Sequence, residues 1–333
     1  MKIVHVREVA NVAHGLVRGL QELGYQAELI EPHENADPRI VRKMFLAPRR
    51  IMRAIEINRR IRRHGFDVVH LHYANSGWMG ALGGYRYALH CHGSDVRVDL
   101  YHPIRKWLVR DSLQRAGLVF FSTPDLHPHV AALRPDAIFT PNPIDADRFH
   151  ATSSGTTDRV RLLINVALKA SKAPEVAFDA AREIKHRCPD VEICAIAYGP
   201  LLPKFECYEQ VRFLAPVPHA DMGRLIGTFD VVLGQFQIGS LGMSELESMA
   251  CGKPVVCFLD ADLYGRWYEQ MPPVAIASDA RSTAEAAIEL IRDRARRQDL
   301  GHRGREWVVR HHHYRNVAAE LARHYHAFLG EVS

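Results

Sequence analysis

The sequence has no apolar run close to the length that a membrane-spanning helix needs, which is about 20 residues. Its start, MKIVHVREVANVAHG, also lacks the apolar core and the small-residue cleavage site of a secretion signal. The first residues instead follow a strand pattern. These absences exclude a membrane-spanning chain and predict a cytoplasmic protein.

Paired C-x-x-C spacing is absent as well, so the cysteines do not form a zinc-ribbon or thioredoxin-like pattern. Most of them lie within apolar runs, and a cytoplasmic location keeps thiols reduced. We therefore expect reduced, buried thiols. The six positions are Cys91, Cys188, Cys194, Cys207, Cys251 and Cys257.

Acidic residues are scarce in the segment 39–63, which contains ten basic residues and Glu56 as its single acidic one. The net charge of the whole chain is +5. Ile51, Met52, Ile55 and Ile61 recur at helical intervals there, so the segment predicts a basic amphipathic helix. One interpretation is a solvated helix face, and the other is attraction to an anionic membrane or a phosphorylated acceptor. The second would place the protein peripherally at the inner membrane face. No nucleic-acid motif accompanies the charge, so nucleic acid is not a predicted partner.

The 333 residues are too many for one hydrophobic core and suit two domains. Short apolar strands alternate with helical segments throughout, which predicts an α/β fold built on parallel sheets. The polar segment 151–158 interrupts the alternation, and we place the domain boundary there. The expected strands are 2–6, 27–30, 67–72, 87–91, 118–122, 137–140, 160–166, 191–197, 211–214, 230–233 and 254–258. The expected helices include 11–23, 174–187, 282–297, 300–311 and 314–329.

One stretch, 229–258, predicts a strand, a glycine-containing loop, a helix and a second strand. Gly239 and Gly242 permit tight turns, and Ser244 is suited to cap the helix. We expect the backbone amides of residues 239–244 to form an electropositive mouth at the C-terminal edge of the sheet. The loop is therefore predicted to hold an anionic ligand.

From Gly242 onward, G-x-x-E-x-E-S-M-A-C-G-K-P-V-V resembles the donor-site signature of retaining glycosyltransferases of GT-B fold, the family 4-like or group 1 enzymes. The resemblance implies that Glu247 binds the donor ribose while the loop amides take the diphosphate. It departs from the signature at Gly239, where the family has its first glutamate. The donor-binding residues implied are Lys169, Gly199, Val217, Gly239, Ser240, Leu241, Gly242, Met243, Ser244 and Glu247.

Two further segments are similar to motifs of the same family. NVALKASKAPE places Lys172 where the family has a diphosphate-binding lysine, but the partner arginine is missing, and Lys169 is the candidate to replace its charge. HGSDVR resembles the acceptor-side motif and implies a catalytic role for His92 beside Lys172 and Glu247. Asp95 and Arg97 are candidate acceptor ligands, or they pair with each other.

The loop before the first helix adds a last acceptor-side candidate. Asn11 is suited either to contact the acceptor or only to cap the helix. No metal site is predicted, because adjacent histidines 311–313 point in different directions around a helix.

The resemblance implies two Rossmann-like domains facing across a cleft: an acceptor domain 1–150, a donor domain 151–312, and a helix 313–333 that returns to the first domain. It further implies a retaining, metal-independent transfer of sugar from a nucleotide diphosphate sugar to an acceptor hydroxyl, without a cofactor. Two alternatives stay open: a degenerate protein that binds nucleotide or glycan without turnover, and a nucleotide-sugar epimerase.

Overall fold

The structure is a computed structural model that describes residues 1–32, 46–150 and 159–330. The predicted boundary segment 151–158 and residues 39–45 of the basic segment lie outside the described residues. Among the residues described, no helix combines the length and apolar character needed to span a bilayer. All six cysteines are free thiols, and four of them are buried.

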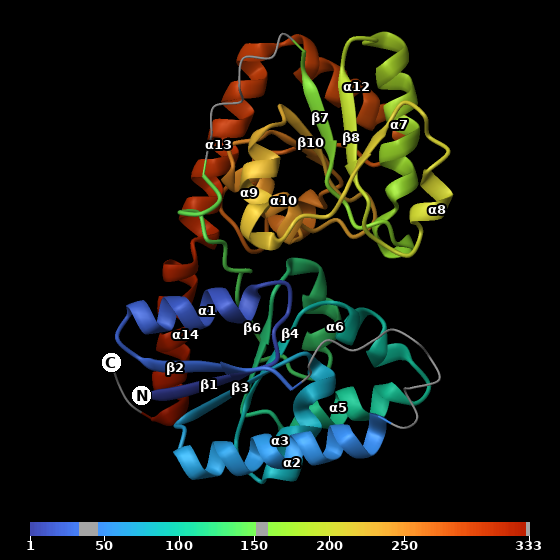
Figure 1. Ribbon diagram of the computed structural model, residues 1–333. Helices are drawn as coiled ribbons and strands as arrows, with labels where there is room; N and C mark the ends of the chain where they lie inside the picture. Colours follow the sequence, from blue (N-terminus) through green and yellow to red (C-terminus); the bar gives the residue numbers. More distant parts are fainter. Residues whose placement is uncertain (33–45, 151–158, 331–333) are drawn as a thin grey trace. The chain divides into compact units, whose positions relative to one another are not determined.

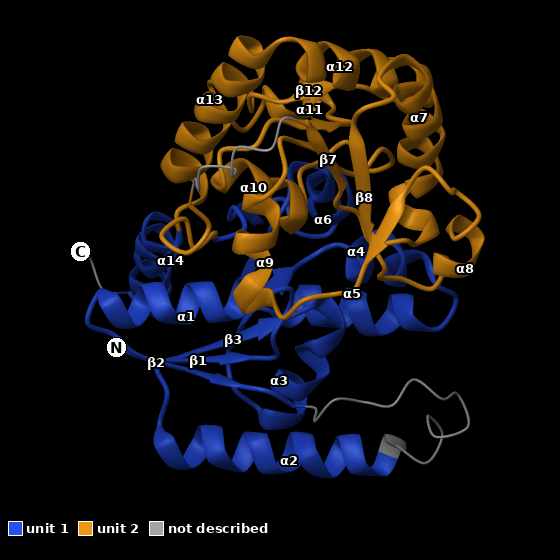
Figure 2. Cartoon of the chain, turned by 45° about the horizontal axis from the view of Figure 1, so that its top comes forward, with its two compact units in different colours: residues 1–143, 314–333 blue, residues 144–313 orange. Residues whose placement is uncertain are grey.

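The chain folds into two compact units, coloured separately in Figure 2. The first unit contains residues 1–143 and 314–333, and the second contains residues 144–313. The chain therefore leaves the first unit after residue 143, and its last helix, 314–329, belongs to the first unit.

The first unit is built on a six-stranded parallel sheet with the strand order β2-β1-β3-β4-β5-β6 (Figure 1). Its four inner strands are short and almost wholly buried, as strands of a parallel sheet covered on both faces must be, whereas the edge strands β2 and β6 are partly exposed. Their bounds are β1 Lys2–Val6, β2 Gln26–Ile30, β3 Val68–His72, β4 Ala88–Cys91, β5 Leu118–Phe121 and β6 Ile138–Phe139.

Helices cover both faces of this sheet. Helices α1 (Val12–Glu22) and α14 (Tyr314–Leu329) lie on one face, and α2 (Leu46–His64), α3 (Gly77–Gly83) and α5 (Arg105–Arg115) lie on the other (Figure 1). The shorter α4 (Ser94–Arg97) and α6 (His127–Ala131) follow β4 and β5.

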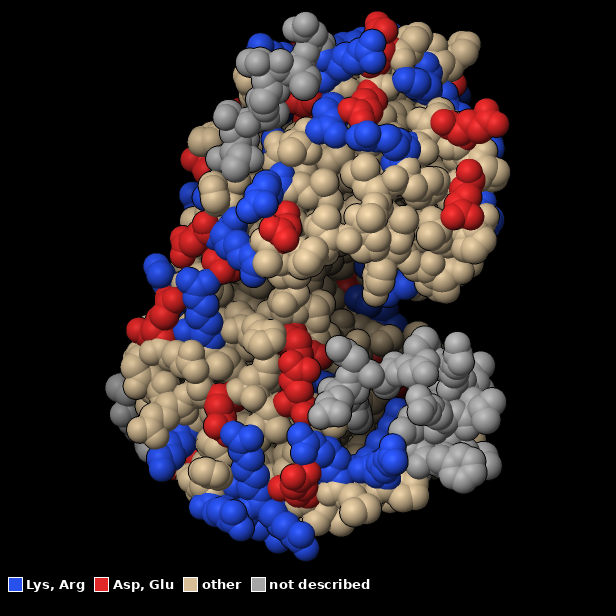
Figure 3. Space-filling model, in the orientation of Figure 1, with Lys and Arg blue, Asp and Glu red and all other residues tan. Residues whose placement is uncertain are grey.

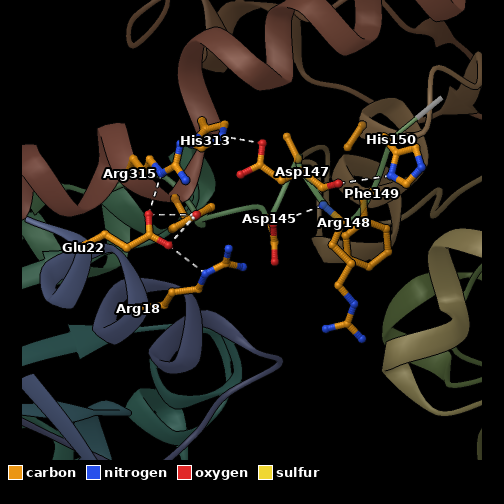
Figure 4. A network of polar contacts seen from close by, with 12 residues as sticks. Arg18, Glu22, Asp145, Asp147, Arg148, Phe149, His150, His313 and Arg315 are labelled. Carbon is orange, nitrogen blue, oxygen red and sulfur yellow. Dashed lines mark hydrogen bonds and ion pairs between the residues drawn. The ribbon is translucent and has the colours of Figure 1, made fainter.

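Helix α14 is fixed to α1 by packing and by charge. A Cβ built on Gly19 would lie 2.5 Å from the Cβ of Ala318, so the glycine permits the close approach. The Glu22 carboxylate accepts hydrogen bonds from Arg18 (3.0 Å), Tyr314 (2.9 Å) and Arg315 (2.5 Å) (Figure 4). The Arg315 hydrogen bond is the main reason that the pKa of Glu22 is lowered to about 2.

The second unit repeats the design, with a parallel sheet of order β12-β11-β10-β7-β8-β9. Helices α7 (Pro174–Arg187) and α12 (Ala280–Arg292) pack together on one face, and α9 (His219–Gly227), α10 (Met243–Ala250) and α13 (Arg294–His312) cover the other (Figure 1). The short α8 (Leu202–Phe205) and α11 (Ala261–Tyr264) lie in connections. The strands are β7 Arg161–Ile164, β8 Glu192–Ile196, β9 Arg212–Leu214, β10 Val231–Leu233, β11 Val255–Cys257 and β12 Ala275–Ile276.

The predicted break between the last two helices of this unit is misplaced. Asp279 and Asp293 each accept a hydrogen bond from a backbone amide three residues later, at 2.8 and 2.9 Å. Because these aspartates cap α12 and α13, the helices begin at Ala280 and Arg294 rather than at residues 282 and 300.

Candidate functional site

The loops that follow the strands of the second sheet leave from one edge, because all of its strands are parallel. Lys169 and Lys172 follow β7, Gly199 follows β8, Val217 follows β9, and the loop 234–242 follows β10. Every predicted donor-site residue therefore comes from a segment that begins at the carboxyl edge of this sheet.

The loop 234–242 is held by buried side chains of its own unit. The Gln235 side chain accepts from the amides of Gln237 (3.0 Å) and Ile238 (2.8 Å) and donates to the carbonyl of Ser240 (2.8 Å). The Glu245 carboxylate accepts from the amides of Gln235 (3.0 Å) and Gly242 (2.8 Å). These bonds fix the loop before any ligand arrives.

The expectation that all the amides of residues 239–244 face a ligand is wrong at two positions. The amide of Leu241 donates to the Tyr264 hydroxyl at 2.8 Å, and that of Gly242 is held by Glu245. Within the described residues, the amides of Gly239, Ser240, Met243 and Ser244 donate no hydrogen bond. The anion-binding capacity therefore lies in these four amides, two of which form the positive end of α10.

Ser244 does not cap α10, contrary to expectation. Gly242 occupies the N-cap position, and Ser244 lies inside the first turn, where its carbonyl accepts from the Ser248 hydroxyl at 2.6 Å. Asn165, at the end of β7, donates to Ser248 at 3.2 Å and so connects that strand to α10. No sequence motif singled out Asn165.

The structure explains why Gly239 is a glycine here. Its φ of 71° lies in the left-handed region, and a Cβ at this position would lie 3.1 Å from both Phe258 and Asp260. A glutamate at this position would combine backbone strain of about 1–3 kcal/mol with crowding. The backbone of this loop therefore favours glycine at position 239.

The side chain of Lys172 reaches the loop 234–242, whereas Lys169 is more exposed. The Lys172 ammonium lies 3.5 Å from the point where a Cβ of Gly242 would be, and Lys172 is half-buried. The amide of Phe236 donates to the Lys172 carbonyl at 3.2 Å, which ties the two segments together. Lys169 is exposed to solvent.

Glu247 lies one turn beyond the start of α10 and is only 6% exposed. Its carboxylate lies 2.7 Å from Nε2 of His219 at the start of α9. Burial raises the pKa of Glu247, and the His219 contact opposes that shift. The sequence did not predict this pairing of Glu247 with His219.

Gly199 allows the loops after β7 and β8 to touch. A Cβ on it would lie 2.4 Å from the Leu168 carbonyl oxygen, and the amide of Leu168 donates to the Tyr198 carbonyl at 2.8 Å. Val217 is half-buried in the segment between β9 and α9. Both residues border the candidate site.

In the first unit, Asp95 organises the turn after β4. Its carboxylate accepts from the amides of Ala74 (2.8 Å), Gly93 (2.7 Å), His92 (3.2 Å) and Val96 (3.1 Å), and it is fully buried. Burial raises its pKa against the effect of these bonds. Asp95 therefore shapes the loop that carries His92, and direct contact with an acceptor stays a prediction.

Arg97 pairs with another residue rather than with Asp95. Its Nε donates to Asp125 at 2.5 Å, and Nη2 donates to Thr123 at 3.2 Å. The Arg97 guanidinium already holds the loop after β5, so an acceptor would have to bind to a group that has these partners as well.

Asn11 lies at the start of α1, but its side chain does not cap the helix. Its backbone is left-handed, with φ of 66°, and the Glu8 carboxylate accepts from the amide of His14 at 2.8 Å instead. The capping interpretation is therefore wrong, and acceptor contact by Asn11 stays a prediction.

His92 lies at the end of an array of five histidines on one face of the first sheet. His5, His70, His72 and His90 are buried, and His92 is half-buried. Nδ1 of His5 lies 2.9 Å from Nε2 of His72, and Nδ1 of His72 lies 2.8 Å from Nε2 of His92. Nδ1 of His70 lies 2.6 Å from the Tyr325 hydroxyl. Burial lowers the pKa of His5 and of His92 to about 3 and also lowers that of the other three.

Sequence reasoning singled out His92 alone. The sequence pattern that could have predicted the array is the two-residue spacing of His70 from His72 and of His90 from His92. Side chains two residues apart on a strand lie on the same face, so all four lie on one face of adjacent strands. Two groups of three in this array, 5/70/72 and 72/90/92, have ring nitrogens near enough to share an ion. Among the described residues, these are the two groups of side chains close enough to bind a metal ion together, and both belong to the first unit.

Two family models match the chain, one in each half. The model of glycosyltransferase family 4 matches residues 9–148, and a glycosyl transferase-like model matches residues 175–323. The chain belongs to the family 4-like glycosyltransferases of GT-B fold. The two parallel sheets with their flanking helices are the fold that this family implies, so the predicted fold class is confirmed.

Curated relatives of the family are similar over part of their length. The chain is 26% identical over 215 residues to the D-inositol 3-phosphate glycosyltransferase of Corynebacterium urealyticum, covering 57% of this chain and 50% of the relative. It is also 26% identical over 262 residues to a GDP-mannose-dependent monoacylated alpha-(1-6)-phosphatidylinositol monomannoside mannosyltransferase of Corynebacterium glutamicum, covering 74% and 64%. The chain thus spans about half to two thirds of these relatives.

A solved structure shares the fold over nearly the whole chain. The Anabaena protein HepE in complex with UDP-glucose matches with a TM-score of 0.75 and 13% sequence identity, covering 98% of this chain and 100% of that one. At this identity the match supports the fold alone.

Proposed function

We propose that this chain transfers a sugar from a nucleotide diphosphate sugar to an acceptor hydroxyl, with retention of the anomeric configuration and without a metal ion or cofactor. The observation that carries the proposal is the arrangement around α10. Unbonded amides at the helix start, the Lys172 ammonium beside Gly242 and the buried Glu247 carboxylate come together at the carboxyl edge of the second sheet.

The chemistry of these groups suits a nucleotide diphosphate. Departure of the diphosphate develops negative charge, which Lys172 and the amides of Met243 and Ser244 would stabilise. Glu247 is a hydrogen-bond acceptor one turn along the helix, suited to the two hydroxyls of a ribose. His92 in the first unit would face the sugar or the acceptor. The GDP-mannose dependence of one relative and the UDP-glucose bound to HepE support a donor of this class.

The direct test is calorimetric titration with UDP, GDP and ADP, followed by transfer assays with sugars of the nucleotide that binds. We expect one nucleotide to bind and its sugar to be transferred or slowly hydrolysed, with the anomeric configuration kept in the product. The activity should survive EDTA. Failure of all three nucleotides to bind would remove the basis of the proposal.

A binding protein without turnover is the second candidate, because Gly239 and the absent arginine depart from the family signature. Nucleotide binding without transfer or hydrolysis of any donor would favour it. The same assays without an acceptor detect epimerisation of the donor sugar, which would favour the epimerase alternative.

We also propose peripheral contact with an anionic membrane through α2 and α5. Helix α2 carries seven arginines opposed within the helix only by Glu56, and Lys and Arg side chains gather over it at the bottom of Figure 3. Met52 on α2 is 70% exposed, and Ile104 and Trp107 around the start of α5 are 78% and 67% exposed. Exposed aromatic and aliphatic side chains among basic residues are typical of membrane-surface binding.

Vesicle co-sedimentation checks this contact. We expect binding to phosphatidylglycerol vesicles but not to phosphatidylcholine vesicles, since each basic group near an anionic surface contributes about 1 kcal/mol. The double variant I104S/W107S should bind more weakly, whereas V309S, which alters an exposed apolar residue of the second unit, should not. Equal binding to both lipids, or to neither, would contradict the proposal.

A further inference from the structure

One nitrogen of His92 is already occupied, because its Nε2 lies 2.8 Å from Nδ1 of the buried His72. Nε2 of His72 continues the contact to Nδ1 of His5 at 2.9 Å. The ring centroids of these two pairs are 5.0 and 5.2 Å apart, close to the nitrogen separation plus two ring radii, so the hydrogen bonds run from edge to edge. His92 is half-buried, and its Nδ1 makes no hydrogen bond among the described residues. This atom is therefore left for a ligand.

The hydrogen bonds continue beyond His5 through a tyrosine of helix α14. The hydroxyl of the buried Tyr325 lies 3.4 Å from Nε2 of His5 and 2.6 Å from Nδ1 of His70. Nε2 of His70 in turn lies 3.2 Å from Nδ1 of His90. These contacts form one hydrogen-bonded chain within the first unit, in the order His92, His72, His5, Tyr325, His70 and His90.

The protons of this chain depend on one another. Burial lowers the pKa of all five histidines and raises that of Tyr325, so every ring is neutral and the hydroxyl keeps its proton at about pH 7. A neutral imidazole has one N–H donor and one bare nitrogen, and a hydroxyl has one proton to donate. Once one bond has a direction, the others follow. Nε2 of His90, at the far end, has no partner among the described residues, so it selects neither direction.

The two distances at Tyr325 select the direction. Hydrogen bonds donated by O–H are shorter than those donated by N–H, so the 2.6 Å contact indicates that the hydroxyl donates to His70. Because that proton is then used, Nε2 of His5 carries its own proton and donates weakly to Tyr325 across 3.4 Å. The same rule places the proton of His72 on Nε2, and the proton of His92 on Nε2.

We propose that Tyr325 holds His92 in the tautomer with its proton on Nε2, so that Nδ1 presents a bare lone pair to the ligand. A bare nitrogen accepts a hydrogen bond, which suits a hydroxyl and not an acceptor-only group such as a phosphate dianion. His92 thus selects a hydroxyl, and Tyr325 is a positioning residue that acts on it from α14. The choice of a hydroxyl rests on the proposed transfer reaction, whereas the tautomer does not.

A shared metal ion is the other use of clustered histidines, and the orientation of the rings opposes it. The ring planes of His5 and His70 differ by 10° with centroids 4.5 Å apart, and those of His90 and His92 by 27° with centroids 4.3 Å apart. An imidazole lone pair lies in the plane of its ring, and a zinc ion lies about 2.0–2.1 Å from each nitrogen. Lone pairs of stacked, nearly parallel rings do not converge on one ion.

The test is long-range ¹H–¹⁵N NMR correlation on the full chain with ¹⁵N-labelled histidine, which shows the nitrogen that carries each proton. The spectrum of His92→Gln assigns the His92 signals by their loss. We expect the proton of His92 on Nε2 at about pH 7. A proton on Nδ1 of His92 in the unaltered protein would overturn the proposal, and this result needs no variant that has to fold.

Tyr325→Phe removes the hydroxyl that sets the direction, so His92 should become a mixture of both tautomers. With equal populations kcat should fall about twofold, because half of the molecules present the wrong group. The affinity for nucleotide should not change, since the candidate donor site lies in the second unit. Tyr314→Phe is the matched control, because this buried tyrosine of the same helix donates to Glu22 at 2.9 Å instead. An unchanged His92 tautomer in Tyr325→Phe, or the same change in both variants, would overturn the role of Tyr325.

Titration with UDP, GDP and ADP on the same samples separates this inference from the proposed function. A proton on Nε2 of His92 without nucleotide binding supports the tautomer and rejects the transfer reaction. Sugar transfer by a protein whose His92 carries its proton on Nδ1 rejects the tautomer alone.

Discussion

Lowering the pH from about 7 to about 5 is expected to destabilise the first unit strongly. His5, His70, His72 and His90 of its sheet are buried, His92 beside them is half-buried, and desolvation lowers the pKa of each. In the unfolded chain each would take up a proton near pH 6.5. The unfolded state therefore binds more protons, and stability rises with pH over this window.

The expected effect is large because the contributions add. At pH 5, His5 and His92, whose pKa is lowered to about 3, each lose about 2 kcal/mol of stability, and His70, His72 and His90 act in the same direction because burial lowers their pKa as well. A loss of about 4 kcal/mol or more is a large part of the stability of a typical domain, about 5–15 kcal/mol. Urea unfolding followed by circular dichroism between pH 7 and pH 5 measures the loss directly. Full stability is reached above about pH 6.5.

The control variant is His90→Leu, which removes one titrating group from the array. Among the described residues, Nε2 of His90 has no hydrogen-bond partner, so the replacement loses only the 3.2 Å contact between Nδ1 of His90 and Nε2 of His70. The dependence of stability on pH should become shallower by about one proton. An unfolding free energy that stays constant from pH 7 to pH 5 would contradict the burial of neutral imidazoles.

The main strands and the order of elements could be predicted because the apolar runs are strong local signals. Strands such as Val231–Leu233 and Val255–Cys257 are buried throughout, and a continuous apolar run is the pattern that such strands need. The glycosyltransferase signature likewise placed Glu247 and Lys172 at one edge of the second sheet. These inferences depend on residues that are close in sequence or belong to one motif.

The remaining features depend on contacts between distant segments. Gln235 and Glu245 hold the amides of their loop, and Tyr264 takes that of Leu241, so the number of open amides could not be read from glycine spacing. A cavity of the first unit is lined by Arg7, Arg50 and Arg105, which no motif connects. Side chains brought together only by tertiary folding leave no periodic signal in the sequence.

Replacing Lys172 by methionine is expected to lower kcat about a hundredfold or more, since removing one preorganised donor to a developing charge has effects of this size. Lys172 is half-buried with its ammonium beside Gly242, where a departing diphosphate would meet the start of α10. Its backbone carbonyl keeps the hydrogen bond from Phe236 in the variant, so the loop should stay in place. Methionine keeps much of the length of the side chain and removes the ammonium group with its charge and N–H donors.

Lys169→Met is the matched comparison, because it removes the same charge five residues after the end of the same strand, β7. Lys169 is exposed, and a solvated lysine contributes little to binding a charged partner, so kcat should fall less than about tenfold. The comparison uses kcat and the affinity for the nucleotide that binds, with thermal unfolding to verify folding. Losses of equal size would show that Lys169 supplies the charge of the missing arginine. An unaffected Lys172 variant would mean that the diphosphate lies elsewhere along this sheet edge.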